Sequence, residues 1–301
     1  MKQLQPISLQ DLPYEQFQVL SPQLRRAARY VIEHPGEIAT RSQRHIATVS
    51  NLPPPTFTRL SRAIGLQNYD QLRELCRYEI LQNKIELADR AKALVEETKE
   101  GSKRQSFIAR QSAAAIANLH SFVEQTPSDH LEEAAQLLKD ARHVFLIGEM
   151  SARGLMDYTS YIANISLSGW KVLGRSGEGL ASELAILSSE DACIVGSIKP
   201  YSNRSIETTK HVTDSGIPVI AITDNILSPL AALARINFFV GTESPQFFPS
   251  HVSMLVVLET LVDMVIRKGG TEAQKHIAAV ERQNHILNEY WQEESAINNG
   301  E

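Results

Sequence analysis

The sequence predicts an α/β protein, in which an all-helical N-terminal domain precedes a doubly wound parallel sheet. Two observations predict this. Residues 1–82 contain only helical patterns of apolar residues, whereas from about Asp129 short, continuous apolar segments alternate with helical ones. Strands that are apolar along their whole length, each followed by a helix, are typical of a parallel sheet buried on both faces. A length of 301 residues accommodates both parts, at roughly 150 residues per domain.

Composition excludes several classes of protein. The chain is 43% hydrophobic and 22% charged, which is ordinary for a globular protein. No apolar run reaches the roughly 18 residues needed to span a membrane, and residues 1–17 lack the apolar core of a signal peptide. Cys76 and Cys193 form neither a disulfide framework nor a metal knuckle. We therefore expect a cytoplasmic protein with no cofactor and no metal.

The charge is unevenly distributed. Residues 1–82 carry 10 Lys and Arg against 7 Asp and Glu, a net +3, and the remainder carries 20 against 28, a net −8, which together give −5. A basic N-terminal part on an acidic body permits contact with nucleic acid through the N-terminal part only.

The first helix is predicted from Ser21-Pro22, where serine can cap and proline can occupy the first turn. It ends at Pro35-Gly36. Helical spacing places one apolar face on Leu24, Ala27, Ala28, Val31 and Ile32.

Two further short helices predict a helix-turn-helix. Ser42 can cap the first, which turns Ile46 and Ala47 inward, residues 51–53 make a turn, and Pro54-Pro55 opens the second, which Gly65 ends. Inward packing of Phe57, Leu60 and Ile64 leaves polar side chains available for bases and phosphates. The expected DNA-binding residues are Thr56, Thr58, Arg59, Arg62 and Arg44. The alternative is a plain helical bundle with a solvated basic face.

Residues 83–128 are predicted to be connecting helices and a natural place for a dimer interface. From Asp129, which can cap a helix, the body is expected to run to residue 270, followed by a C-terminal helix and tail over 271–301. Its predicted strands and the segments that follow them are HVFLIG, a helix at 151–168, WKVL, a helix at 179–187, ACIVGSI, a helix at 203–215, IPVIAIT, a short helix at SPLAALA, INFFV and a long helix from about Ser250.

The stretch Asp191–Glu207 is the strongest candidate for a ligand site. A buried strand leads into a polar loop and then a helix that Ser202 or Ser205 can cap. Exposed N–H groups, the positive end of the helix dipole, hydroxyls and Lys199 or Arg204 would together attract an anion. The alternative is an ordinary turn between a strand and a helix.

Two other loops offer candidate ligand-binding residues. Gly148 permits a tight turn after a strand, and Ser151 can cap the helix that follows. Ser250 and His251 begin the long helix, where Ser250 can cap and His251 can hydrogen-bond a ligand. The full expected set is Gly148, Ser151, Ser197, Lys199, Ser202, Ser250 and His251.

No motif for catalysis is present: the sequence has no HExxH, GxSxG, CxxC or Walker A. Glu183 and Glu207 are predicted near the ligand end of the sheet, where an isomerase would need a base. Each is equally a solvated helix residue, and we expect no catalytic residues.

The chain resembles RpiR-type (MurR/RpiR) transcriptional regulators over roughly residues 20–268. The N-terminal part matches the family pattern at Thr56, Thr58, Arg59, Gly65, Tyr69, Leu72 and Arg73. The body resembles a SIS (sugar isomerase) domain in HVFLIGEMSARG, DACIVGSI, GIPVIAITDNILSPLA and INFFVGTES. The resemblance implies a flavodoxin-like sheet of about five strands and a ligand that is a sugar phosphate.

Two loops depart from that family. Where SIS domains usually carry SxSGxT to hold phosphate, this chain has Ser197-Ile-Lys-Pro-Tyr-Ser202, so Lys199 and Pro200 replace small residues. Proline has no N–H to donate, although Lys199 can supply a charge. The first loop, usually GxGxS, is Gly148-Glu-Met-Ser-Ala here, so its second glycine is missing, and Glu149 would repel a phosphate. A sugar acid, a different phosphosugar or another small metabolite therefore stays open as the ligand.

The resemblance therefore implies a DNA-binding transcriptional regulator whose SIS domain senses a small phosphorylated carbohydrate, acting as a homodimer or homotetramer with operator DNA as partner and no membrane. Two rivals stay open: a phosphosugar isomerase with an accessory helical domain, and a sugar-binding effector that regulates a protein partner.

Overall fold

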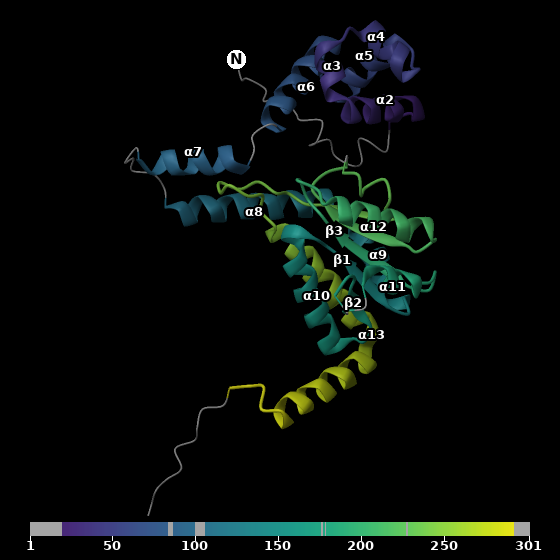
Figure 1. Ribbon diagram of the computed structural model, residues 1–301, viewed down its shortest axis with the longest axis vertical. Coiled ribbons are helices and arrows are strands. Elements are labelled where there is room, and N and C mark those ends of the chain that lie inside the picture. The colour runs from purple at the N-terminus through teal and green to yellow at the C-terminus, as the bar shows by residue number, and fades with distance from the viewer. Residues whose placement is uncertain are drawn as a thin grey trace, which may run out of the picture. The chain divides into compact units, whose positions relative to one another are not determined.

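The computed structural model describes residues 20–83, 87–99, 106–175, 177, 179–226 and 228–291 (Figure 1). The expectations for the first 19 residues, for residues 100–105 of the connecting segment and for the last residues of the C-terminal tail lie outside these residues. The chain divides into two compact units. One comprises Met1–Pro127, Ser197–Tyr201 and Ala221–Met254, and the other Ser128–Gly196, Ser202–Ile220 and Leu255–Glu301. The four expected domains stay a prediction.

Residues 20–83 form a bundle of five helices. These are α2 (Pro22–Glu33), α3 (Pro35–Thr40), α4 (Gln43–Ser50), α5 (Pro54–Ala63) and α6 (Tyr69–Asn83). Ser21 caps α2 by accepting the N–H of Leu24, as predicted. Fully buried Phe57 lies at the centre, with its ring edge-on to those of Tyr30 and Tyr69 at 6.4 and 6.3 Å between centroids. The bundle thus has its own aromatic and aliphatic core.

Helices α7 (Leu87–Lys99) and α8 (Phe107–Gln125) follow, as the helical patterns predicted. Ser106 caps α8 by accepting the N–H of Ala109. Within the ranges that the structure describes, no helix is both long and apolar enough to cross a membrane.

The body contains a five-stranded sheet in the order β2-β1-β3-β4-β5. The strands are β1 (Val144–Ile147), β2 (Trp170–Val172), β3 (Ala192–Gly196), β4 (Val219–Thr223) and β5 (Ile236–Phe239). The pairs β1–β2 and β1–β3 are parallel, with Val144 opposite both Trp170 and Ala192. This order is the flavodoxin-like one, and the predicted fold class is confirmed.

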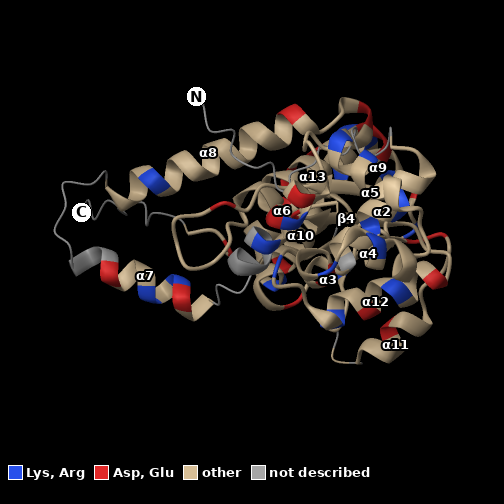
Figure 2. Ribbon diagram, turned by 90° about the horizontal axis from the view of Figure 1, so that it is seen from above, with Lys and Arg blue, Asp and Glu red and all other residues tan. Residues whose placement is uncertain are grey.

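Helices cover the sheet. They are α9 (Ser128–Asp140), α10 (Arg153–Ser166, after the 3₁₀ turn η2, Met150–Ala152), α11 (Leu180–Ala185), α12 (Asn203–Asp214) and α13 (Val252–Ile286). Figure 2 shows α9 and α13 on one side, with α11 and α12 on the other. Tyr158 of α10 donates to Glu259 of α13 at 2.8 Å, so α10 also lies beside α13.

Two local predictions need correction, and one is confirmed. Helix α9 begins at Ser128, so Asp129 lies in its first turn instead of capping it. The segment SPLAALA forms turns, because the N–H groups of Ala231 and Leu233 bond three residues back to Ser228 and Leu230. The long helix kinks at Gly270, whose φ of 55° is left-handed, and this kink separates the two helices predicted there.

Candidate functional site

The helix-turn-helix geometry is present at α4 and α5. Ser42 caps α4, and Asn51 ends it in the left-handed conformation, with its N–H bonded to Ala47 and Thr48. A residue that tolerates positive φ lets the chain reverse within a short turn. Buried Leu52 anchors the turn, and α5 begins at Pro54.

Three of the expected DNA-binding residues, Arg44, Arg59 and Arg62, are exposed. Thr58 is half-buried and accepts a hydrogen bond from the Gln43 amide at 2.8 Å. Thr56 is fully buried, so its predicted availability to DNA is wrong. It precedes buried Leu60 by one helical turn and therefore shares its inward face.

The carboxyl ends of β1 and β3 mark the expected ligand end of the sheet. These strands are neighbours, and the chain continues from β1 to β2 on one side of the sheet and from β3 to β4 on the other. Gly148 follows β1, and a Cβ atom there would lie 2.5 Å from Met156 Cγ and 3.3 Å from the carbonyl oxygen of Ala152. Packing of α10 thus requires glycine at this position. Ser151 is exposed within η2 and caps no helix, because α10 begins two residues later.

The start of α12 has the predicted anion-binding character. Ser202 caps it, with its Oγ 3.2 Å from the N–H of Ser205. The Ser205 hydroxyl is buried and has no hydrogen-bond partner in the described part of the chain. Arg204 Nε lies 3.3 Å from Glu149 Oε1, so the carboxylate that would repel phosphate is paired with a cation.

A partly buried polar cluster joins the loops after β3 and β4. The Tyr201 hydroxyl donates to Asp224 Oδ1 at 2.7 Å and accepts from the Asn225 amide at 3.1 Å. The Thr223 hydroxyl lies 3.2 Å from the same Asp224 oxygen and 2.7 Å from the Ser228 hydroxyl. The backbone N–H of Lys199 also bonds the Asp224 carboxylate, while the Lys199 side chain is exposed.

Electrostatics keep Tyr201 a donor in this cluster. Burial and then the charge of Asp224 raise the pKa of Tyr201, so its hydroxyl keeps its proton. Burial also raises the pKa of Asp224, outweighing the opposing hydrogen bonds from Tyr201, Thr223 and the backbone. A raised pKa reflects a carboxylate whose charge is poorly compensated.

The start of α13 places Ser250 and His251. Buried Ser250 lies two residues before the start of α13 and accepts the N–H of Val252 at 3.4 Å, so it bonds the first N–H of the helix from just outside the cap position. His251 Nδ1 lies 3.3 Å from the carbonyl oxygen of Pro249, which assigns the proton to Nδ1. Nε2 is then an acceptor, buried and without a partner among the described residues. Burial lowers the pKa of His251, which favours this neutral form.

The two carboxylates considered as bases for an isomerase differ in position. Glu183 is buried and accepts the N–H of Gly174, so it fixes the chain after β2. Glu207 is exposed on α12. No group of three or more His, Cys, Asp or Glu side chains that could hold a metal occurs within the described ranges.

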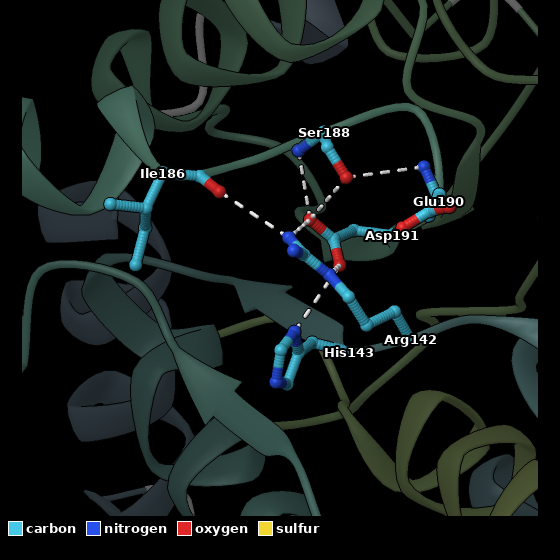
Figure 3. Close-up of polar contacts among 6 residues, drawn as sticks. All are labelled: Arg142, His143, Ile186, Ser188, Glu190 and Asp191. Atoms are coloured by element: carbon cyan, nitrogen blue, oxygen red, sulfur yellow. Dashed lines mark hydrogen bonds and ion pairs between the residues drawn. The ribbon is translucent and has the colours of Figure 1, made fainter.

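A second charged cluster lies before the strands, at their amino ends (Figure 3). Asp191 accepts two bonds from the Arg142 guanidinium, at 2.9 and 2.8 Å, and one from the N–H of Ser188 at 2.8 Å. His143 Nδ1 lies 3.3 Å from it. Burial alone would raise the pKa of Asp191, but these bonds hold it at about 2. The cluster ties the chain before β1 to the chain before β3.

Sequence reasoning missed the Tyr201–Asp224–Asn225 cluster. The signal was present, because a tyrosine ends one loop and an Asp-Asn pair follows the next strand. A turn explains Asp224-Asn225 equally well, and this hid their bonding to a loop 23 residues earlier.

Residues 137–264 match the model of the SIS domain family. A relative from Haemophilus influenzae, named as an uncharacterized HTH-type transcriptional regulator, is 24% identical over 282 residues, covering 90% of this chain and 92% of that protein. A second with the same description, from Caldanaerobacter subterraneus subsp. tengcongensis, is 21% identical over 85% of this chain and 90% of its own length.

Two solved structures share the fold. The sugar isomerase domain of an RpiR transcription factor from Sphaerobacter thermophilus has a TM-score of 0.55 and 22% identity, covering 59% of this chain and 99% of that one. The Vibrio vulnificus NanR protein complexed with ManNAc-6P has a TM-score of 0.54 and 18% identity, covering 90% of this chain and 96% of its own. The resemblance predicted from the sequence is confirmed.

Proposed function

The chain contains a SIS domain and resembles RpiR-type regulators over most of its length, and from this premise we propose that it is a DNA-binding transcriptional regulator whose SIS domain senses a small carbohydrate metabolite. The observation that carries the proposal is the joining of two parts in one chain: a helix-turn-helix with exposed arginines and a parallel sheet with polar loops at its carboxyl ends. Acting on chromosomal DNA, it would work in the cytoplasm.

Arg59 and Arg62 are the proposed DNA contacts, supported by their exposure on α5, and Arg44 on α4 is a further one. An arginine that reads a guanine contributes about 1–3 kcal/mol. Removal of one that contacts a phosphate lowers the salt dependence of binding by about one ion. Thr58 stays a candidate at the edge of this face, whereas buried Thr56 is withdrawn.

A mobility-shift assay with DNA upstream of the gene and its neighbours tests this assignment. We expect wild type to bind one such fragment, and Arg59→Ala with Arg62→Ala to lose at least about tenfold in affinity, which is 1.4 kcal/mol. The matched control removes two exposed cations of α13, Lys275→Ala with Arg282→Ala, and should bind normally. Undiminished binding by the Arg59 and Arg62 variant would refute the helix-turn-helix interface.

Sugar phosphates are the first effectors to test, because the fold neighbour NanR is described in complex with ManNAc-6P. The capped start of α12 and buried Ser205 support a polar ligand at the carboxyl end of β3. A ligand with different affinity for two arrangements of the protein would shift its affinity for DNA. We therefore expect one sugar or sugar phosphate to change the midpoint of the mobility shift.

The proposal includes no enzymatic activity. Glu183 accepts the N–H of Gly174, and this bond supports a structural role for the buried one of the two carboxylates considered as isomerase bases. Turnover of an aldose or ketose phosphate by the pure protein would favour the isomerase instead.

The second copy of the chain is the proposed partner on the operator, since helix-turn-helix proteins read paired half-sites as dimers. Helix α8 supports this, because Ile108, Ile116 and Val123 are 69, 64 and 74% exposed and lie toward one side of it. Sedimentation should show an oligomer that Ile116→Glu weakens and Ile186→Glu, at an exposed site on the body, leaves intact. A monomeric wild-type protein would exclude this interface.

A further inference from the structure

The loop Ser197–Tyr201 directs donors toward the protein's own carboxylate. The backbone N–H of Lys199 and the hydroxyl of Tyr201 both bond Asp224, the latter at 2.7 Å. Between them Pro200 has no N–H. The donors that a loop in this position offers to a bound anion are therefore already directed at an anion that belongs to the chain.

The position of Asp224 is held firmly. Tyr201 accepts from the Asn225 amide, and Thr223 bridges toward Asp224 and the Ser228 hydroxyl, so the cluster is bonded from two sides. The groups that donate hydrogen bonds to Asp224 are neutral. A second anion placed beside this carboxylate would therefore be repelled by a like charge in a partly buried site.

We propose that Asp224 acts as an internal anion that fills the anion place of the loop after β3, so that the effector presents an uncharged, hydroxyl-bearing part of itself to this loop. The inference rests on the proposed function, because it concerns the effector of the same SIS domain. Asp224 is then the residue that sets this ligand site apart from a phosphate-binding one. Any phosphate of the effector is bound by other groups.

Removal of the carboxylate tests this directly. Asp224→Ala frees the N–H of Lys199 and the hydroxyl of Tyr201 and leaves space for an added anion. Thermal unfolding is followed against inorganic phosphate at constant ionic strength. We expect a saturable rise in the unfolding midpoint for Asp224→Ala, with half-saturation at least about tenfold below that of wild type. Formate, a smaller anion, should act in the same way.

Asp214→Ala is the matched control, since it removes an exposed aspartate at the far end of α12 and should behave like wild type. Should Asp224→Ala fail to fold, Asp224→Asn decides the matter, because it removes the charge and keeps the shape. It should also bind phosphate more tightly than wild type does.

Equal phosphate dependence in wild type and variant, including no dependence in either, would overturn the role of Asp224. The same preparations are tested in the mobility shift. DNA binding by the wild type together with a failed phosphate response removes this inference alone, whereas absence of DNA binding removes the proposed function.

Discussion

Asp191, which is buried, and Asp224, which is partly buried, are two carboxylates whose pKa values move in opposite directions. Asp191, before β3, is bonded by the Arg142 guanidinium and the N–H of Ser188, and its pKa falls to about 2. Asp224, after β4, is bonded by the hydroxyls of Tyr201 and Thr223 and by backbone N–H, and burial raises its pKa.

The difference lies in the charge of the donors. A guanidinium supplies a full positive charge in a two-bond fork, whereas hydroxyl and amide donors supply only dipoles. The amino ends of the strands thus carry a compensated charge, which stabilises the fold. At the carboxyl ends, no cation compensates the charge of Asp224, so its desolvation cost remains. Such charges are expected at sites that serve binding and not stability.

The largest effect should come from Asp191→Asn. The substitution removes the charge that two guanidinium bonds and one N–H bond compensate, and hydrogen bonds to charged groups contribute about 1.5–3 kcal/mol. We expect the free energy of unfolding in urea at pH 7 to fall by that amount. Arg142→Lys keeps the charge but loses the two-bond fork, so the free energy of unfolding should fall partway. In the exposed control Asp214→Asn it should not change. An unchanged free energy of unfolding in Asp191→Asn would show that the cluster does not stabilise the fold.

The pH dependence of stability should carry the signature of Asp191. Its folded-state pKa of about 2 is below the ordinary value of 3.8, so the unfolded chain takes up the proton first as pH falls. Its contribution is therefore complete above about pH 4 and disappears as pH falls toward 2. Wild type should lose its advantage over Asp191→Asn across this window, measured by urea unfolding at several pH values. Parallel curves would contradict the lowered pKa.

Asp224→Asn should have a smaller effect of the opposite sign. Because burial raises the pKa of Asp224, the folded protein favours a neutral group at this position over an ionised one. Asparagine is neutral and similar in shape, so the free energy of unfolding at pH 7 should be unchanged or rise by up to about 1 kcal/mol. A loss as large as that of Asp191→Asn would show that the two carboxylates serve the same purpose.

The pattern of apolar residues sufficed to predict the sheet and most helices, because period and capping are local properties. Ser21, Ser42 and Ser202 cap helices where the sequence placed them. Ser151 was misplaced, because capping depends on where a helix begins within one or two residues. Thr56 was misplaced although α5 begins at the predicted Pro54, because it lies one turn before buried Leu60 and shares its inward face. Element ends are set by packing and by the turn before them, and a single sequence shows neither directly.

The clusters of the site were harder to predict, because their partners are distant in sequence. Tyr201 and Asp224 are separated by 23 residues and Arg142 and Asp191 by 49. Each of these side chains also has a local explanation, as a loop residue, a turn or a solvated charge. The family resemblance indicated which loops matter, and only the geometry showed that a carboxylate of the protein is bonded to one of them.

Glu149 tests whether a cationic partner is what distinguishes a carboxylate that stabilises the fold, such as Asp191, from one bonded only by neutral donors, such as Asp224. It is paired with Arg204 at 3.3 Å, but its partner is 56% exposed, so water already compensates part of both charges. Glu149→Gln should therefore lower the free energy of unfolding by only about 0.3 kcal/mol. Its larger consequence should be electrostatic: Arg204 loses its counter-charge and becomes available to an anion at the start of α12. Half-saturation by inorganic phosphate in the thermal assay should fall in Glu149→Gln, whereas Glu207→Gln, an exposed change on the same helix, should leave it unchanged. A large loss of stability without tighter phosphate binding would mean that the Glu149–Arg204 pair belongs, like Asp191, to the framework of the fold.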